Sequence, residues 1–207
     1  MREPYYQDEA VTVYHGDCRE IVPELGKFDL LLTDPPYGIE YRTTLPNNTD
    51  WGYIENDTAA FDLSFLFDIE ADKVIFGANC FPQLLPHRGR WICWYKRGDG
   101  AEKAIGSPFE LAWSSRTSGF DRFYKVVHGG FVNSDGGKRR HPTQKPTKLF
   151  KLILDDYPDA QTILDPFAGS GTTGRAAKDL GRKAVLIEIE ERYCEIAANR
   201  MRQEVLI

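Results

Sequence analysis

The chain has 207 residues, of which 42% are hydrophobic and 28% charged, and its formal net charge is −5. This length and composition suit one α/β domain of ordinary size. No apolar run approaches the ~20 residues that a membrane-spanning helix needs, and the charged first residues predict that there is no signal peptide. The four cysteines form no C-x-x-C pair. We therefore expect reduced thiols, no metal site and a cytoplasmic protein.

Strands are predicted where short apolar runs end in turn residues. In chain order they cover residues 11–14, 28–33, 73–76, 91–95, 110–114, 161–165 and 183–188. Helices are expected at about 18–25, between the strands at 73–76 and 91–95, and at 145–155, 175–180 and 190–204. Because strands alternate with helices, we predict a single α/β domain over residues 1–207. Its seven-stranded, mostly parallel sheet is expected to carry helices on both faces.

The segment Asp34-Pro35-Pro36-Tyr37 directly follows the predicted strand at 28–33. Each proline fixes its own φ, lacks a backbone donor and pushes the preceding residue into an extended conformation. A stiff loop is therefore expected at the carboxyl end of the strand, the edge where open α/β sheets bind ligands.

This loop presents chemistry that suits the amino group of a nucleobase. The nitrogen of that group is a poor nucleophile because its lone pair is delocalised into the ring. Hydrogen bonds to Asp34 and to the Pro35 carbonyl favour a pyramidal nitrogen and stabilise the positive charge that develops on it. Tyr37 can stack on a base that has left the helix. On these residues alone, a proline-stiffened turn with a capping Asp is an equally good interpretation.

Residues 38–60 show no apolar period, and they are predicted to form a long loop inserted after this motif. Trp51 and Tyr53 fit a loop that faces DNA, and they fit equally well a loop anchored on the body of the domain.

A second motif, at residues 161–174, reads as a strand, a glycine turn and the start of a helix. Gly169, Gly171 and Gly174 match G-x-G-x-x-G, and the next strand ends on Glu188, an acid that suits hydrogen bonds to ribose hydroxyls. Taken alone, the motif fits a nicotinamide dinucleotide equally well. A P-loop is disfavoured because its Lys-Ser/Thr pair is missing, and a turn used only for packing leaves the acid without a role.

Positive charge is concentrated in residues 116–148, which hold eight Lys/Arg and two acids. This stretch therefore carries +6, and −11 remains for the rest of the chain. It also contains aromatic residues and glycines, a composition typical of a segment that contacts nucleic acid, although a solvated surface loop is the alternative. DNA contacts are predicted from Arg116, Arg122, Lys125, Lys138, Arg139 and Arg140.

Together these blocks resemble the class beta S-adenosylmethionine-dependent DNA amino-methyltransferases, which act on adenine N6 or cytosine N4. The matching blocks follow the family's order from residue 11 to about 200. They are His15-Gly16-Asp17-Cys18, Thr33-Asp34-Pro35-Pro36-Tyr37, His141-Pro142-Thr143-Gln144-Lys145-Pro146, Asp165-Pro166-Phe167-Ala168-Gly169-Ser170-Gly171-Thr172-Thr173 and Glu188. The resemblance implies a Rossmann-like methyltransferase fold with a circularly permuted motif order. It also implies S-adenosylmethionine as cofactor, double-stranded DNA as substrate and residues 116–141 as a small target-recognition segment.

The resemblance further implies roles for single residues. The catalytic set is Asp34, Pro35, Pro36 and Tyr37. Asp17 is assigned to the adenine amine of the cofactor and Glu188 to its ribose, whereas Lys145 is open to either cofactor or DNA phosphate. The full set of expected cofactor contacts is Asp17, Cys18, Thr143, Lys145, Asp165, Phe167, Ala168, Gly169, Ser170, Gly171, Thr172 and Glu188.

In this family Asp rather than Ser at position 34 favours adenine, so N6-methyladenine is the predicted product and N4-methylcytosine the alternative. A non-catalytic DNA-binding protein on the same fold is the alternative of another class. A third alternative is a nicotinamide-dependent oxidoreductase. It fits the glycines and Glu188, but it gives no role to the segment from Asp34 to Tyr37. The sequence does not decide whether the protein forms a homodimer. It also does not decide whether a restriction endonuclease or a separate specificity subunit is its partner.

Overall fold

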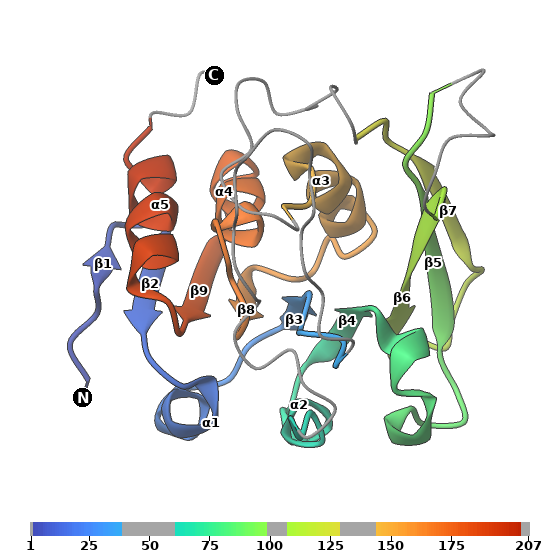
Figure 1. Ribbon diagram of the computed structural model, residues 1–207, viewed down its shortest axis with the longest axis horizontal. Coiled ribbons are helices and arrows are strands. Elements are labelled where there is room, and N and C mark those ends of the chain that lie inside the picture. Colours follow the sequence, from blue (N-terminus) through green and yellow to red (C-terminus); the bar gives the residue numbers. More distant parts are fainter. Residues whose placement is uncertain (1, 39–60, 99–106, 129–143, 204–207) are drawn as a thin grey trace.

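In the part of the chain that the structure describes, nine strands form one sheet with helices on both faces (Figure 1). The computed structural model describes residues 2–38, 61–98, 107–128 and 144–203. The strands are β1 (Tyr6–Gln7), β2 (Val11–His15), β3 (Leu30–Thr33), β4 (Asp72–Phe76), β5 (Arg90–Tyr95), β6 (Phe109–Ser114), β7 (Arg122–Lys125), β8 (Thr162–Asp165) and β9 (Lys183–Glu188). The helices are α1 (Cys18–Ile21), α2 (Phe65–Asp68), α3 (Thr147–Asp155), α4 (Thr172–Asp179) and α5 (Glu191–Met201). No helix within these ranges is long and apolar enough to cross a membrane.

The strands follow the order β1-β2-β9-β8-β3-β4-β6-β5-β7. Strands β2, β9, β8, β3 and β4 are parallel, whereas β6 is antiparallel to both of its neighbours. The predicted α/β fold with a mostly parallel sheet is confirmed, and all seven predicted strands are present. The strand count is wrong by two. The edge strands β1 and β7 lack an apolar run, because β1 has two residues and β7 begins and ends on a charge.

The connections diverge between β8 and β3, which are neighbours in the sheet. From β8 the chain passes through α4 to β9 on one side, whereas from β3 it passes through α2 to β4 on the other. In an open α/β sheet such a switch point leaves a crevice at the carboxyl ends of the two strands. The loops that follow Thr33 and Asp165 therefore start at the position where this fold binds ligands.

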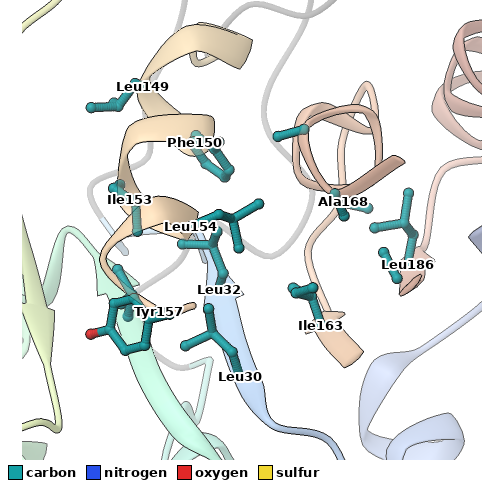
Figure 2. Close-up of a cluster of buried hydrophobic side chains, with 14 of the residues drawn as sticks. Leu30, Leu32, Leu149, Phe150, Ile153, Leu154, Tyr157, Ile163, Ala168 and Leu186 are labelled. Carbon is teal, nitrogen blue, oxygen red and sulfur yellow. The ribbon is translucent and has the colours of Figure 1, made fainter. Parts of the chain in front are cut away.

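Helices α3, α4 and α5 cover one face of the sheet, above it in Figure 1. Leu30 and Leu32 of β3 belong to this layer, and Figure 2 shows Leu32 beside Leu154 of α3. The intervening Leu31 faces the opposite layer. All three leucines of β3 have no exposed surface, which explains why the strand reads as a continuous apolar run.

The opposite face is covered by α1, α2 and short 3-10 turns. The helix predicted between residues 76 and 91 is absent from the structure. Two 3-10 turns, Ala78–Cys80 and Pro82–Leu84, take its place. Pro82 and Pro86 both lack the backbone N–H that the interior of a helix needs, and they divide this segment into pieces too short for a regular helix.

Helix α3 begins two residues later than predicted, and this shift places Lys145 outside it. Pro146 is the N-cap in an extended conformation, with φ −72° and ψ 135°. Leu149, Phe150 and Ile153 then turn one apolar stripe toward the sheet. Lys145 thus lies on the approach to the helix, at the same edge of the sheet as the loop after β3.

We expect Leu32→Ala to destabilise the domain strongly, because the side chain has no exposed surface and its removal leaves a cavity beneath α3. The expected loss is about 2–5 kcal/mol in the free energy of unfolding, measured by urea denaturation. Phe120→Ala is the control, because that ring is 83% exposed, and its effect should stay within about 0.5 kcal/mol. Equal losses in the two variants would contradict the assignment of this core.

Candidate active site

The two motif loops meet through a hydrogen bond between the last residues of β3 and β8. The Thr33 hydroxyl donates to Asp165 Oδ1 at 2.7 Å. Asp165 also accepts from the backbone N–H of Phe167 at 3.1 Å and from the Thr173 hydroxyl at 2.5 Å. Burial raises the pKa of Asp165 to about 6, and these donors only partly offset it. Asp165 therefore ties β3, the glycine turn and α4 together.

Asp34 is half-buried, with its side chain 18% exposed, and both of its carboxylate oxygens have donors. Oδ1 accepts from the Tyr37 hydroxyl at 2.6 Å, and Oδ2 forms an ion pair with the ammonium group of Lys145. Burial raises the pKa of Asp34, and Lys145 offsets this rise only in part. The predicted catalytic residues Asp34 and Tyr37 are thus joined to each other, Pro35 is buried beside them, and Pro36 is half-buried.

Lys145 lies between two carboxylates. Its Nζ atom is 3.1 Å from Glu110 Oε2, and the other oxygen of Glu110 accepts from Lys96 Nζ at 2.7 Å. Burial disfavours the charged ammonium of Lys145, but Asp34 and Glu110 outweigh it and raise its pKa. Glu110 is absent from the predicted site, although an acid inside the apolar strand at 109–114 is a usable signal. The structure places Lys145 on Asp34, the predicted catalytic acid, and its predicted cofactor contact stays a prediction.

Tyr37 rests against Gly77, the residue that follows β4. A Cβ atom at position 77 would lie 1.9 Å from Tyr37 Cε1. The glycine is required for a second reason, because its φ of +66° is strained for any other residue. Sequence reasoning did not select Gly77, since its role depends on a ring 40 positions earlier.

The carboxylate of Glu188 lies at the end of β9 and closes the glycine turn. Its Oε2 accepts from the N–H of Gly169 at 2.7 Å, and its Oε1 accepts from the N–H of Glu190 at 2.9 Å. Glu188 is 8% exposed, and burial raises its pKa to about 7 against the lowering effect of these two donors. The two predicted cofactor elements, the turn and the acid, are therefore in direct contact.

Two of the glycines in this motif are explained by packing. A Cβ atom on Gly171 would lie 2.9 Å from Ala197 Cβ in α5, and one on Gly174 would lie 2.6 Å from Leu186 Cδ1 in β9. Packing and ligand binding are thus compatible uses of the same turn. The turn needs glycine to let α4 approach its neighbours, and Gly169 is the member that contacts the acid.

The remaining predicted cofactor residues line the same turn or support it. Ala168, Ser170 and Thr172 are buried, and the Thr172 hydroxyl donates to the Lys145 carbonyl at 3.2 Å. Arg200 of α5, which is not a predicted site residue, donates to the carbonyl of Ser170 at 2.9 Å and to the Thr172 hydroxyl at 3.2 Å. These hydrogen bonds from α5 stabilise the conformation of the glycine turn.

Asp17 and Cys18 lie at the start of α1. Asp17 caps this helix by accepting from the Arg19 N–H at 2.8 Å, and it pairs with the Arg19 guanidinium at 2.5 Å. The guanidinium lies 4.8 Å from the ring centroid of Phe61, which contacts the ring of Phe167 edge-on. The Cys18 thiol is buried in the core, and burial raises its pKa to about 12, so it is not a reactive group.

Two of the predicted DNA contacts, Arg116 and Arg122, form ion pairs within the domain. Arg116 pairs with Asp72 at 2.7 Å and Arg122 pairs with Asp156 at 2.8 Å. Asp72 begins β4, at the sheet edge opposite to Asp34, and Asp156 follows the far end of α3. Both arginines thus have ion-pair partners within the domain and remain partly exposed, so their contacts with DNA stay a prediction.

Lys125 is exposed at the carboxyl end of β7, so a DNA contact there stays a prediction. The other predicted elements, Lys138, Arg139, Arg140, Thr143 and the loop at 39–60, lie outside the described residues. Within the described residues, no group of three or more His, Cys, Asp or Glu is placed to hold a metal ion.

Comparison with known proteins agrees with this geometry. The family model for DNA methylases of the N6/N4 type matches residues 91–199. The type II methyltransferase M2.DpnII of Streptococcus pneumoniae is 48% identical over 258 positions, which cover 99% of this chain and 94% of that protein. The chain belongs to the N6/N4 DNA methylase family.

Solved structures share the fold of this methylase. A crystal structure of an M1.HpyAVI–SAM complex is 24% identical, with a TM-score of 0.58, and covers 93% of this chain and 100% of that one. The PvuII DNA methyltransferase, described as cytosine-N4-specific, is 14% identical, with a TM-score of 0.66, and covers 100% of this chain and 91% of that one. The predicted family is therefore confirmed, and the predicted methyltransferase fold with it.

Gly77→Ala should impair methyl transfer by this methylase, because the new Cβ displaces the Tyr37 ring and breaks its hydrogen bond to Asp34. A displacement of this size is expected to lower kcat by about 100-fold. Gly181→Ala is the matched control, since Gly181 has a similar φ of +68° and a Cβ atom added there would meet nothing within 4 Å. Similar losses of kcat in both variants would show that backbone strain, rather than the Tyr37 contact, decides the effect.

Proposed function

We propose that this methylase transfers a methyl group from S-adenosylmethionine to the N6 amino nitrogen of adenine in double-stranded DNA. The observation that carries the proposal is the position of Asp34. It follows β3 at the switch point, beside the glycine turn that follows β8, and the Thr33–Asp165 hydrogen bond joins the two elements. A nucleophile-binding acid and a cofactor-binding turn thus share one crevice.

The residues of the turn fit the proposed cofactor. Asp165 and Glu188 are buried acids whose partners in the structure are hydroxyl and N–H donors rather than cations. Their raised pKa values show that a nearby positive charge or further donors would favour their ionised forms. A sulfonium supplies such a charge and ribose hydroxyls supply such donors. The rings of Phe61 and Phe167 offer an apolar surface for an adenine ring.

When bound, S-adenosylmethionine supplies a methyl group that its positive sulfur has already activated. The protein then has to hold the amine in line and stabilise the charge that develops on nitrogen. Both oxygens of Asp34 accept from donors in the structure, so the same oxygens suit the N–H groups of an adenine amine. The raised pKa of Asp34 also suits it to receive the proton that the nitrogen releases as the new N–C bond forms.

Adenine is preferred over cytosine because position 34 carries Asp rather than Ser, the feature that favours adenine in the resembling family. Cytosine N4 is the second candidate, because the cytosine-N4-specific PvuII enzyme shares the fold at a TM-score of 0.66. The two amines offer the same donors to Asp34, so the base is decided by groups around the ring rather than by the acid alone.

Target recognition is proposed to rest on a small surface. The alignment with M2.DpnII runs over 258 positions, whereas this chain has 207 residues, so at least 51 of these positions have no counterpart here. We propose that residues 116–141 supply the DNA contacts and that the recognised sequence is short. A role in restriction–modification follows the type II relative, and a second copy or a separate specificity subunit would enlarge the surface.

Binding of the cofactor should weaken as the pH falls below about 7. The pKa of Glu188 is raised to about 7, and ribose hydroxyls that donate to the carboxylate would lower it. The complex therefore favours the ionised acid, and binding near neutral pH releases protons. Titration calorimetry with S-adenosylhomocysteine should show about tenfold weaker affinity near pH 6 than near pH 8. Glu188→Gln should bind weakly at both, and a wild-type affinity that does not change with pH would contradict the assignment.

Asp34→Ala should lose methyl transfer, by at least about 100-fold in kcat, while it retains affinity for S-adenosylhomocysteine. The wild type and the variant are incubated with DNA and S-adenosylmethionine, and the DNA is then digested to nucleosides. N6-methyladenine in the digest of the wild-type reaction supports the proposal. N4-methylcytosine in its place would support cytosine, the second candidate, as the target base. DNA that is retained by the wild type but never methylated would instead indicate a non-catalytic DNA-binding protein.

A further inference from the structure

The ammonium group of Lys145 stands where a substrate amine has to arrive. It forms an ion pair with Oδ2 of Asp34, and the Tyr37 hydroxyl donates to Oδ1. An adenine amine and an ammonium are both donors, so they compete for the same carboxylate oxygens. The amine can approach Asp34 more closely when Lys145 turns away, because the ammonium then leaves Oδ2 to the incoming donor.

Glu110 offers the acceptor that Lys145 needs. Its Oε2 is 3.1 Å from Lys145 Nζ, close enough for the ammonium to change partners with a small side-chain movement. Lys96 holds Oε1 at 2.7 Å and thereby fixes the direction of the carboxylate. Glu110 reaches this position because β6 runs antiparallel to β4, which brings its first residues to the edge where the parallel strands end.

We propose that Glu110 is a positioning residue for methyl transfer, which draws the Lys145 ammonium away from Asp34 when the target amine binds. This inference rests on the proposed function. Two carboxylates and two ammonium groups share the site, so the cluster as a whole stays neutral when Lys145 changes partner. The positive charge that develops on the target nitrogen then faces the carboxylate of Asp34. Lys145 and Lys96 outweigh the effect of burial and lower the pKa of Glu110 to about 2, so Glu110 is ionised and able to receive the ammonium.

Glu110→Gln keeps the shape of the side chain and removes its charge. Lys145 then has one carboxylate partner, and it binds Asp34 more tightly in competition with the amine. We expect kcat to fall by roughly 10- to 100-fold, with an unchanged affinity for S-adenosylhomocysteine. The acidic limb of the kcat profile should also move to lower pH, because the negative charge of Glu110 contributes to the raised pKa of Asp34. A merely structural role would not move this limb.

Asp8→Asn provides the matched control. Asp8 also pairs with a lysine, Lys178, at 2.5 Å, and its side chain is 22% exposed against 27% for Glu110. It lies beside β1, at the other end of the sheet from β6. The control variant should lose stability in urea denaturation while kcat per folded molecule stays unchanged.

A double-mutant cycle with Glu110→Gln and Lys145→Met tests the inference. If Glu110 acts through Lys145, the Gln substitution should change kcat by less than about twofold once Lys145 is already Met, so the two losses are not additive. Additive losses, or an Asp8→Asn variant that loses as much kcat as Glu110→Gln, would overturn the role of Glu110. A wild-type enzyme that transfers no methyl group at all would overturn the proposed function itself.

Discussion

The parallel pairing of β3 with β8 is the constraint on which the site depends. Thr33 and Asp165 are 132 positions apart in the chain, yet they end neighbouring strands and share a buried hydrogen bond of 2.7 Å. Because the connections from these strands leave in opposite directions, their two loops face one crevice rather than being covered by a crossover. The loop that carries Asp34 and the loop that carries the glycines therefore start side by side.

The buried and half-buried acids around this crevice divide into two kinds by their partners. Asp34 and Glu110 face the ammonium groups of Lys145 and Lys96, whereas Asp165 and Glu188 are held by hydroxyl and N–H donors. Burial raises the pKa of Asp165 to about 6 and that of Glu188 to about 7, and it also raises the pKa of Asp34. Glu110, which faces two ammonium groups, has a lowered pKa instead. The first kind suits the handling of an amine, and the second suits a cationic, hydroxyl-rich cofactor.

The cation that completes the first group is also an obstacle to the reaction. Lys145 neutralises Asp34 in the crevice, but its ammonium contacts an oxygen that the target amine would use in the proposed reaction. Glu110 is a second carboxylate within reach of the same ammonium, and we propose that it accepts Lys145 when the amine binds. An ion pair that has a second acceptor nearby can be stable and can still exchange partners, because the site as a whole remains neutral during the exchange.

Much of this protein could be read from its sequence, because the decisive features are local. The prolines at 35 and 36 impose a stiff loop, the apolar run at 30–32 requires a strand buried on both faces, and the glycine turn requires small residues. These features indicated the α/β fold, the family and the acid at position 34. They rest on backbone geometry and burial, which neighbouring residues largely decide.

Tertiary structure decided which side chains act together. Position alone does not show that Arg116 and Arg122 pair within the domain, that Gly77 makes room for Tyr37, or that Lys145 lies between Asp34 and Glu110. The local pattern also missed β7 and placed a helix where the structure has two 3-10 turns. Such contacts join strands that are distant in the chain. Their partners are set by strand order and direction, and no local pattern of residues encodes these.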